Sequence, residues 1–207
     1  MLKHFSLIFL SIIILSFSHT SNAGITLEEL FYNNDDLFHL KILDAIPDEA
    51  KIEHGPENAK NIIIEFMDYF CGYCKKIHLE LIGIVENRND VKVIFVQHPI
   101  LSESSLILSK YVIAANLQNK GFELHHSIFT IKGSLTQEKL EKAIIDSGVN
   151  VPKLKIDSEK PNTEKAIKLT SFIAGGLGAR GTPSLFINEE FIGGYISKDQ
   201  IIGLLKK

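Results

Sequence analysis

The feature that most constrains this chain is its pair of cysteines, Cys71 and Cys74, the only two in 207 residues. They stand between an apolar stretch, residues 61–66, and a helical pattern that begins at Cys71. Residues i and i+3 share one face of a helix, so the two sulfur atoms can close a disulfide across its first turn. This placement predicts thiol–disulfide chemistry on a strand–turn–helix unit.

Cys71 is expected to be the nucleophile of the pair. At the start of the helix, unpaired backbone N–H groups and the helix dipole favour a thiolate and lower its pKa below the free value of about 8.5. Cys74 is then the residue that resolves a mixed disulfide.

Two other interpretations of the cysteine pair are weaker. Half of a zinc site needs two further ligands, but the eight histidines are scattered, with only His125 and His126 adjacent. An inert structural disulfide in so small a loop contributes little chain-entropy stabilisation. We therefore expect no metal and no cofactor, and we expect His125 and His126 to be surface and core residues of a helix.

The N-terminus has the three-part layout of a secretory signal. Lys3 precedes an apolar run, residues 7–17, and Ser21-Asn22-Ala23 forms a small-residue exit. We expect cleavage near Ala23 and export to the periplasm or cell envelope. An uncleaved membrane anchor is less favoured, because the run is shorter than the roughly 20 residues that span a bilayer.

The remaining length fits one domain with an insertion. The expected organisation is a signal peptide at 1–23, a helical leader or oligomerisation arm at 24–54, and a domain at 55–207. A homo-oligomer could form through the arm. The net charge of −3 gives no reason to expect nucleic acid as a partner.

Apolar stretches at 61–66 and 91–97 predict parallel strands joined by the helix that begins at Cys71. A helical insertion is expected at about 102–178, followed by strands at 184–187 and 191–195 in a short hairpin. The fold class is therefore α/β: a mixed sheet flanked by helices and split by a helical insertion.

Single residues mark the expected helix ends. Ser102, Thr136 and Ser197 can cap the start of helices, Pro161 opens another, and Gly121 and Gly148 end two of them. On the residues alone, Pro183 after Thr182 would begin its strand as an ordinary trans proline. His98, at a strand end, is expected to cap or pack rather than catalyse.

These features together resemble the DsbA family of thioredoxin-fold oxidoreductases. Three motifs carry the resemblance: Glu65-Phe66 before Cys71-Gly72-Tyr73-Cys74-Lys75, then His98-Pro99-Ile100-Leu101, then Gly181-Thr182-Pro183-Ser184. It covers about residues 52–207 and implies a thioredoxin-like fold with an inserted helical subdomain.

The resemblance also implies roles for residues outside the cysteine pair. Pro183 would be cis and face the cysteines, and it would expose the backbone of Thr182 to an extended substrate segment. Gly72 and Tyr73 would complete the substrate-binding surface.

Glu65 matches the family's buried acid beneath Cys74, where a raised pKa would let it take the proton of the resolving thiol. On the residues alone, Glu65 could instead be a strand-end acid that reaches solvent. Asp68 is a weaker candidate for the same role and is better interpreted as a cap of the active-site helix.

The implied function is an exported thiol–disulfide oxidoreductase that forms or rearranges disulfides in unfolded or cysteine-containing exported proteins. A membrane redox partner would reset its cysteine pair. Gly72-Tyr73 stands where the strong oxidases of the family have Pro-His. The residue before Pro183 is a threonine, Thr182, as it is in the isomerases. Oxidase, isomerase and reductase action therefore all remain open. A non-enzymatic surface protein on the same scaffold is the alternative from another class.

Overall fold

The structure is a computed structural model that describes residues 38–207. Its strands are β1 (Lys51–His54), β2 (Asn61–Met67), β3 (Val91–Gln97), β4 (Ser184–Ile187) and β5 (Glu190–Gly193). Its helices are α2 (Phe38–Ala45), the short 3-10 helix η1 (Asp48–Ala50), α3 (Gly72–Val85), α4 (Glu103–Asn116), α5 (Gly121–Thr130), α6 (Gln137–Asp146), α7 (Val151–Ser158), α8 (Pro161–Gly176) and α9 (Lys198–Leu204). None of these helices is long and apolar enough to cross a membrane.

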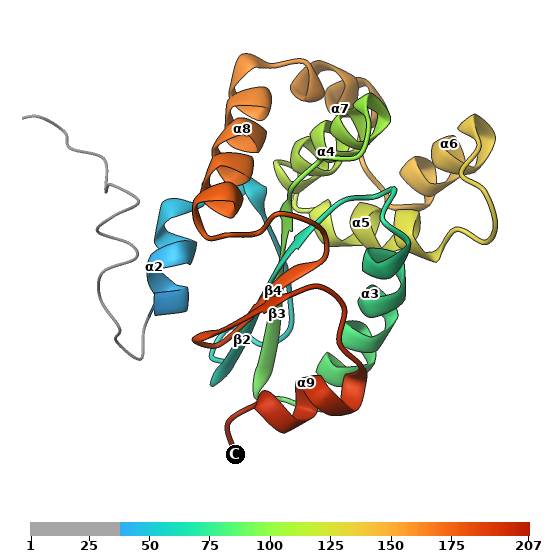
Figure 1. Ribbon diagram of the computed structural model, residues 1–207. Helices are drawn as coiled ribbons and strands as arrows, with labels where there is room; N and C mark the ends of the chain where they lie inside the picture. Colours follow the sequence, from blue (N-terminus) through green and yellow to red (C-terminus); the bar gives the residue numbers. More distant parts are fainter. Residues whose placement is uncertain (1–37) are drawn as a thin grey trace, which may run out of the picture.

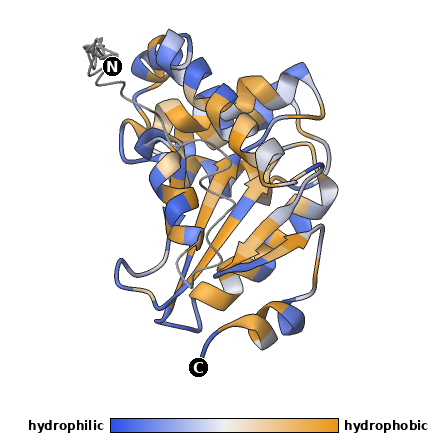
Figure 2. Cartoon of the chain, turned by 60° about the vertical axis from the view of Figure 1, so that its left-hand side comes forward, coloured by the Kyte–Doolittle hydropathy of each residue, from blue (hydrophilic) through white to orange (hydrophobic). Residues whose placement is uncertain are grey.

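The five strands form one mixed sheet in the order β1-β3-β2-β4-β5. The central strands β2 and β3 are parallel and joined by α3, while β4 runs antiparallel to β2 on its other side. Every residue of β2 is buried, because helices cover both faces of the sheet (Figure 1). The hydrophobic residues accordingly concentrate in the strands and on the inward sides of the helices (Figure 2).

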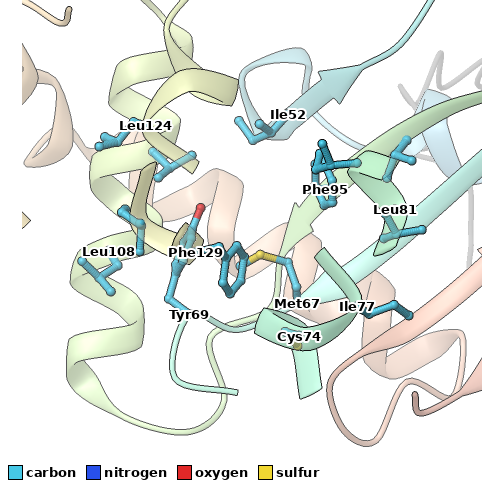
Figure 3. Packing of buried hydrophobic residues seen from close by; sticks show 14 of the residues in the cluster. Ile52, Met67, Tyr69, Cys74, Ile77, Leu81, Phe95, Leu108, Leu124 and Phe129 are labelled. Atoms are coloured by element: carbon cyan, nitrogen blue, oxygen red, sulfur yellow. The ribbon is translucent and has the colours of Figure 1, made fainter. Parts of the chain in front are cut away.

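Each face of the sheet has its own apolar core. On one face, α3, α9 and the helices α4 to α7 pack around Met67, Phe95 and Phe129 (Figure 3). On the other face, α2 and α8 pack around Ile64 and Phe66. The predicted α/β class, with a mixed sheet and a helical insertion, is confirmed.

Most of the predicted helix boundaries are confirmed. Ser102 and Thr136 cap α4 and α6 through their side chains, and Ser197 forms a capping box with Gln200 at the start of α9. Pro161 opens α8, and Gly148 follows α6 with a positive φ of 75°.

The prediction that Gly121 ends a helix is wrong, because Gly121 is the first residue of α5. The preceding helix, α4, ends at Asn116, and Asn119 supplies the left-handed residue of the turn. The Asn116 side chain lies only 2.4 Å from the place where a Cβ of residue 121 would stand. Gly121 is therefore needed for close packing.

Two predicted segments have different limits in the structure. The hairpin loop is shorter than expected, since β5 begins at Glu190 rather than 191 and ends at Gly193. Part of the predicted leader segment, 24–54, belongs to the domain: β1 pairs with β3, and Ile42 of α2 is fully buried against the sheet. The predicted signal peptide and residues 24–37 lie outside the described residues.

Candidate active site

Cys71 is the N-cap residue of α3, and its sulfur accepts a hydrogen bond from the Cys74 N–H at 3.3 Å. The turn between β2 and α3 is closed by the Cys71 N–H, which donates to the Asp68 carbonyl at 3.1 Å. A sulfur atom in this position meets N–H groups that have no partner inside the helix. Both cysteines thus lie at the start of the helix, as the sequence predicted.

The Thr182–Pro183 peptide bond is cis, which the family resemblance implied and the residues alone did not. Ser184 pairs with Phe66 in the antiparallel register of β4 and β2, so Thr182 lies at the end of the sheet where α3 begins. The Thr182 carbonyl oxygen is 3.1 Å from the Cys71 sulfur. The chain therefore brings Thr182 against the cysteine pair.

Both thiols are free in this structure, and their pKa values are shifted in opposite directions. Cys71 lies at the surface edge, with 8% of its area exposed, whereas Cys74 is completely buried. The Cys74 thiol, the Thr182 side chain and the N–H groups of Cys74 and Tyr73 together lower the pKa of Cys71 to about 6. Burial raises the pKa of the Cys74 thiol far above its usual value. Only Cys71 can be a thiolate near neutral pH.

Glu65 is fully buried in β2, so the alternative of a strand-end acid that reaches solvent is wrong. Burial, and then the negative charge of Cys71, raise the pKa of its carboxyl well above the usual value, while the Cys74 thiol opposes the shift. Among residues 38–207, neither oxygen of the Glu65 carboxyl has a hydrogen-bond partner. Glu65 is therefore an unsatisfied buried acid that interacts electrostatically with both cysteines.

The prediction that Asp68 caps the active-site helix is wrong, because the cap is Cys71 itself. The buried Asp68 carboxylate instead joins the active-site turn to the insertion. It accepts hydrogen bonds from Phe70 N at 2.8 Å, Ile100 N at 2.9 Å, Leu101 N at 3.0 Å and Ser105 Oγ at 2.7 Å. These four donors hold the turn before Cys71 against the start of α4.

Gly72 and Tyr73, the residues between the cysteines, are both exposed. The Tyr73 ring stacks on Tyr195, with ring centroids 5.6 Å apart, and Lys76 Nζ lies 4.1 Å from the Tyr195 centroid. Sequence reasoning missed Tyr195 and Lys76. Tyr195 is more than 100 residues from Tyr73, and a lone tyrosine after a strand carries no local signal of such a contact.

His98 is buried, and its backbone N–H donates to the Met67 carbonyl at 2.8 Å. Burial lowers the pKa of its ring, and a hydrogen bond to the Ala179 backbone partly opposes this shift. His98 thus packs beside the end of β2 and near Ala179, which agrees with the expectation that it caps or packs.

Four histidines, His54, His78, His125 and His126, lie close together between α3 and α5 and form the histidine cluster; nothing in the sequence indicated that they meet. Nε2 of His78 in α3 lies 3.0 Å from Nδ1 of His126 in α5. Nδ1 of His125 lies 2.9 Å from the Tyr69 hydroxyl oxygen. The His54 ring stacks on Phe122. As predicted for a helix, His125 is a core residue and His126 is half-buried. Among the described residues, no group of His, Cys, Asp or Glu is arranged to hold a metal ion.

The comparisons with known proteins agree with this geometry. The Thioredoxin_4 family model, described as thioredoxin, matches residues 48–207. No curated protein matches the chain.

Three solved structures are similar over most of their length. They are a thioredoxin-like oxidoreductase from Silicibacter pomeroyi DSS-3 (25% identity, TM-score 0.71, 83% of this chain and 95% of that one), the catalytic domain of Proteus mirabilis ScsC (27%, 0.70, 80% and 93%) and the thiol-disulfide exchange protein alpha-DsbA2 from Wolbachia pipientis (26%, 0.70, 79% and 90%). The chain thus belongs to the Thioredoxin_4 family and is a thioredoxin-like, DsbA-family oxidoreductase with Cys71 and Cys74 as its CxxC pair.

Proposed function

We propose that this protein forms or rearranges disulfides in exported proteins by dithiol–disulfide exchange through Cys71 and Cys74. The observation that carries the proposal is the contrast between the two thiols at one helix start. Cys71 reaches the surface with a pKa of about 6, while Cys74 is buried with a raised pKa. In a pair of this kind, the accessible sulfur exchanges with a partner protein, and the buried sulfur reacts only with the accessible one.

The exchange begins with the oxidised pair. A client thiolate attacks the Cys71 sulfur, the Cys71–Cys74 bond breaks, and Cys74 leaves with the electron pair and takes up a proton. A second client thiolate then attacks the client sulfur of the mixed disulfide. It expels Cys71 as a thiolate, so that the client is oxidised by two electrons and the cysteine pair is reduced.

In the reverse direction, Cys74 must lose its proton to resolve a mixed disulfide on Cys71. Glu65 is the group proposed to take that proton, since it interacts with the Cys74 thiol and its pKa is raised by burial. Thr182 and Pro183, with Gly72 and Tyr73, are proposed to bind the client chain beside Cys71. The exposed Tyr73 ring and the Thr182 carbonyl at 3.1 Å from the sulfur support this role.

The stabilised thiolate of Cys71 favours action as an oxidase. Any group that stabilises the reduced pair makes the oxidised pair a stronger oxidant, and the known potentials of this fold run from about −270 to about −120 mV. Isomerase or reductase action is the second candidate, because Tyr73 is a neutral residue where strong oxidases have a histidine. A non-enzymatic scaffold would give no reason for the acidity of Cys71.

Two measurements test the proposal. The Cys74→Ser variant should accumulate mixed disulfides with a reduced, unfolded client, whereas Cys71→Ser should form none; failure of Cys74→Ser to trap a client would exclude the exchange mechanism. Equilibration with glutathione, paired with refolding of a scrambled substrate, separates the activities. A strongly oxidising potential without unscrambling identifies an oxidase, and unscrambling identifies an isomerase.

Export and resetting belong to the same proposal. The signal-like residues 1–23 support a site of action in the periplasm or cell envelope. Continued oxidation of clients requires a redox partner that reoxidises the pair, which we expect to be a membrane protein.

A further inference from the structure

A single side chain from the C-terminal part of the chain, Tyr195, lies over the first two turns of α3. Tyr195 belongs to the loop between β5 and α9. Its ring stacks on the Tyr73 ring, with centroids 5.6 Å apart, and Lys76 Nζ lies 4.1 Å from its centroid. Its hydroxyl donates a hydrogen bond to Glu80 Oε1 at 2.7 Å. Tyr195 therefore contacts α3 through both its ring and its hydroxyl.

The three residues that Tyr195 contacts form one stripe along α3. Tyr73, Lys76 and Glu80 are separated by three and then four residues, a spacing that places side chains on the same side of a helix. The stripe begins between the two cysteines and ends two turns further along the helix. Tyr195 thus links the turn that carries the cysteines to the turns that follow it.

The loop that carries Tyr195 is held at both of its ends. The strand before it, β5, pairs with β4, and the helix after it, α9, begins with the capping box of Ser197 and lies beside α3 (Figure 1). Tyr195 itself is half-buried and packs against the apolar core on that face of the sheet. Its position is therefore fixed by elements other than the first turn of α3.

The first turn of α3 has few stabilising features of its own. Its N-cap is the sulfur of Cys71, which is a weaker hydrogen-bond acceptor than the oxygen of a serine or aspartate cap. Gly72, its first residue, has a low helix propensity, and the turn contains no acidic side chain to interact with the helix dipole. Because helix ends open more easily than helix middles, contacts from outside the helix decide how well this turn is ordered.

We propose that Tyr195 is a positioning residue that keeps the first turn of α3 closed, so that the backbone N–H groups at the helix start stay on the Cys71 sulfur. This inference rests on the proposed exchange at Cys71. The N–H groups of Tyr73 and Cys74 are among the groups that lower the pKa of Cys71. The oxidised pair has no thiolate to stabilise, so Tyr195 favours the reduced pair and makes the oxidised pair a stronger oxidant.

The test compares the full-length protein with its Tyr195→Leu variant, which keeps an apolar side chain against the core but loses the ring and the hydroxyl. Ultraviolet absorbance of the thiolate should show the Cys71 pKa raised by about 0.5, a roughly threefold change in the ionisation constant that an aromatic pair can supply. The equilibrium constant for reduction of the disulfide by glutathione should fall about threefold. Amide hydrogen exchange of the reduced protein should become faster at Tyr73 and Cys74 and stay unchanged at Leu81.

Two further variants locate the effect. Tyr195→Phe keeps the ring and loses only the donation to Glu80, so it should raise the Cys71 pKa by about half as much. Phe191→Ala is the matched control. Phe191 is an aromatic residue of the same hairpin, but it packs on Phe186, on the face of the sheet opposite α3. This variant should unfold at a lower urea concentration and keep the Cys71 pKa.

The outcomes separate the positioning role from general loosening and from the chemistry. An unchanged Cys71 pKa in Tyr195→Leu overturns the proposal, and so does an equal shift in Phe191→Ala. A raised pKa without faster exchange at Tyr73 and Cys74 also overturns it, because Tyr195 would then not act through the first turn. If Tyr195→Leu does not fold, the shift in Tyr195→Phe decides in the same way. None of these pKa measurements needs a client, so a protein with an acidic Cys71 that exchanges with no client thiol refutes the proposed function alone.

Discussion

The Cys71 sulfur lies 3.1 Å from the carbonyl oxygen of Thr182, across 111 residues of sequence. The contact joins the first turn of α3 to the cis peptide bond before β4. In addition, the Thr182 side chain is one of the groups that lower the pKa of Cys71 to about 6. Thr182 thus contacts the sulfur through its carbonyl oxygen and lowers the pKa of Cys71 through its side chain.

The Thr182→Val substitution keeps the shape of the side chain and removes its hydroxyl. Loss of one hydrogen bond to a charged group should raise the pKa of Cys71 by about 1. Ultraviolet absorbance of the thiolate, followed from pH 4 to pH 9, measures this change. Thr182→Ser, which retains a hydroxyl, is the control, and an unchanged Cys71 pKa in Thr182→Val would show that the hydroxyl does not act on the sulfur.

The Glu65→Gln substitution should slow the resolution of a mixed disulfide on Cys71 by about 100-fold, the usual contribution of a general base. The first attack by Cys71 should remain fast, because the groups that stabilise its thiolate stay in place. Single-turnover kinetics with a disulfide-containing peptide separate the two steps. Glu86→Gln, at the exposed end of the same helix, is the control. Equal slowing of both steps would contradict a role specific to resolution.

The Asp68→Asn substitution tests the link between the cysteine turn and the insertion. Asn has one acceptor oxygen where the carboxylate has two, so its NH₂ group must replace one of the two oxygens. That NH₂ group would face two donors and accept from neither: Ile100 N–H and Leu101 N–H on one side, or Phe70 N–H and the Ser105 hydroxyl on the other. We expect a loss of about 3 kcal/mol in the free energy of unfolding, measured with urea.

Ser105→Ala, which removes one of the four donors, should cost about 1 kcal/mol and serves as the graded comparison. If Asp68→Asn costs no more than Ser105→Ala, the carboxylate does not hold the turn.

Local patterns along the chain predicted β2, α3, β3 and β4, because continuous apolar stretches and capping residues such as Ser102 are signals that a few neighbouring residues carry. The contacts that complete the site are different in kind. Tyr195 meets Tyr73, and His78 meets His126, only after the sheet and the insertion have been assembled. The cis state of Pro183 was likewise predicted through the family resemblance and not through its neighbours. Gly121 was misassigned because glycine both ends helices and permits close approaches, and the sequence does not show Asn116 lying against it.

The histidine cluster should make the protein sensitive to acid. Burial, followed by the positive charges that His126 and His54 would carry, lowers the pKa of His78 from 6.5 to about 3, and the pKa of the fully buried His125 is also lowered. A histidine whose pKa is depressed in the folded state stays neutral while the unfolded chain takes up a proton. Stability from this source is therefore full above about pH 6.5 and falls as the pH drops toward 3.

Between pH 7 and pH 5, His78 alone should lower the free energy of unfolding by about 2 kcal/mol. The His78→Leu variant loses the contact with His126 at both pH values, but it should show a fall between them that is smaller by about 2 kcal/mol. Urea unfolding of the reduced protein at pH 7 and pH 5 measures the two differences. An identical fall in the wild type and the variant would mean that His78 is not neutral in the folded protein at pH 5, and it would remove His78 as a source of acid sensitivity.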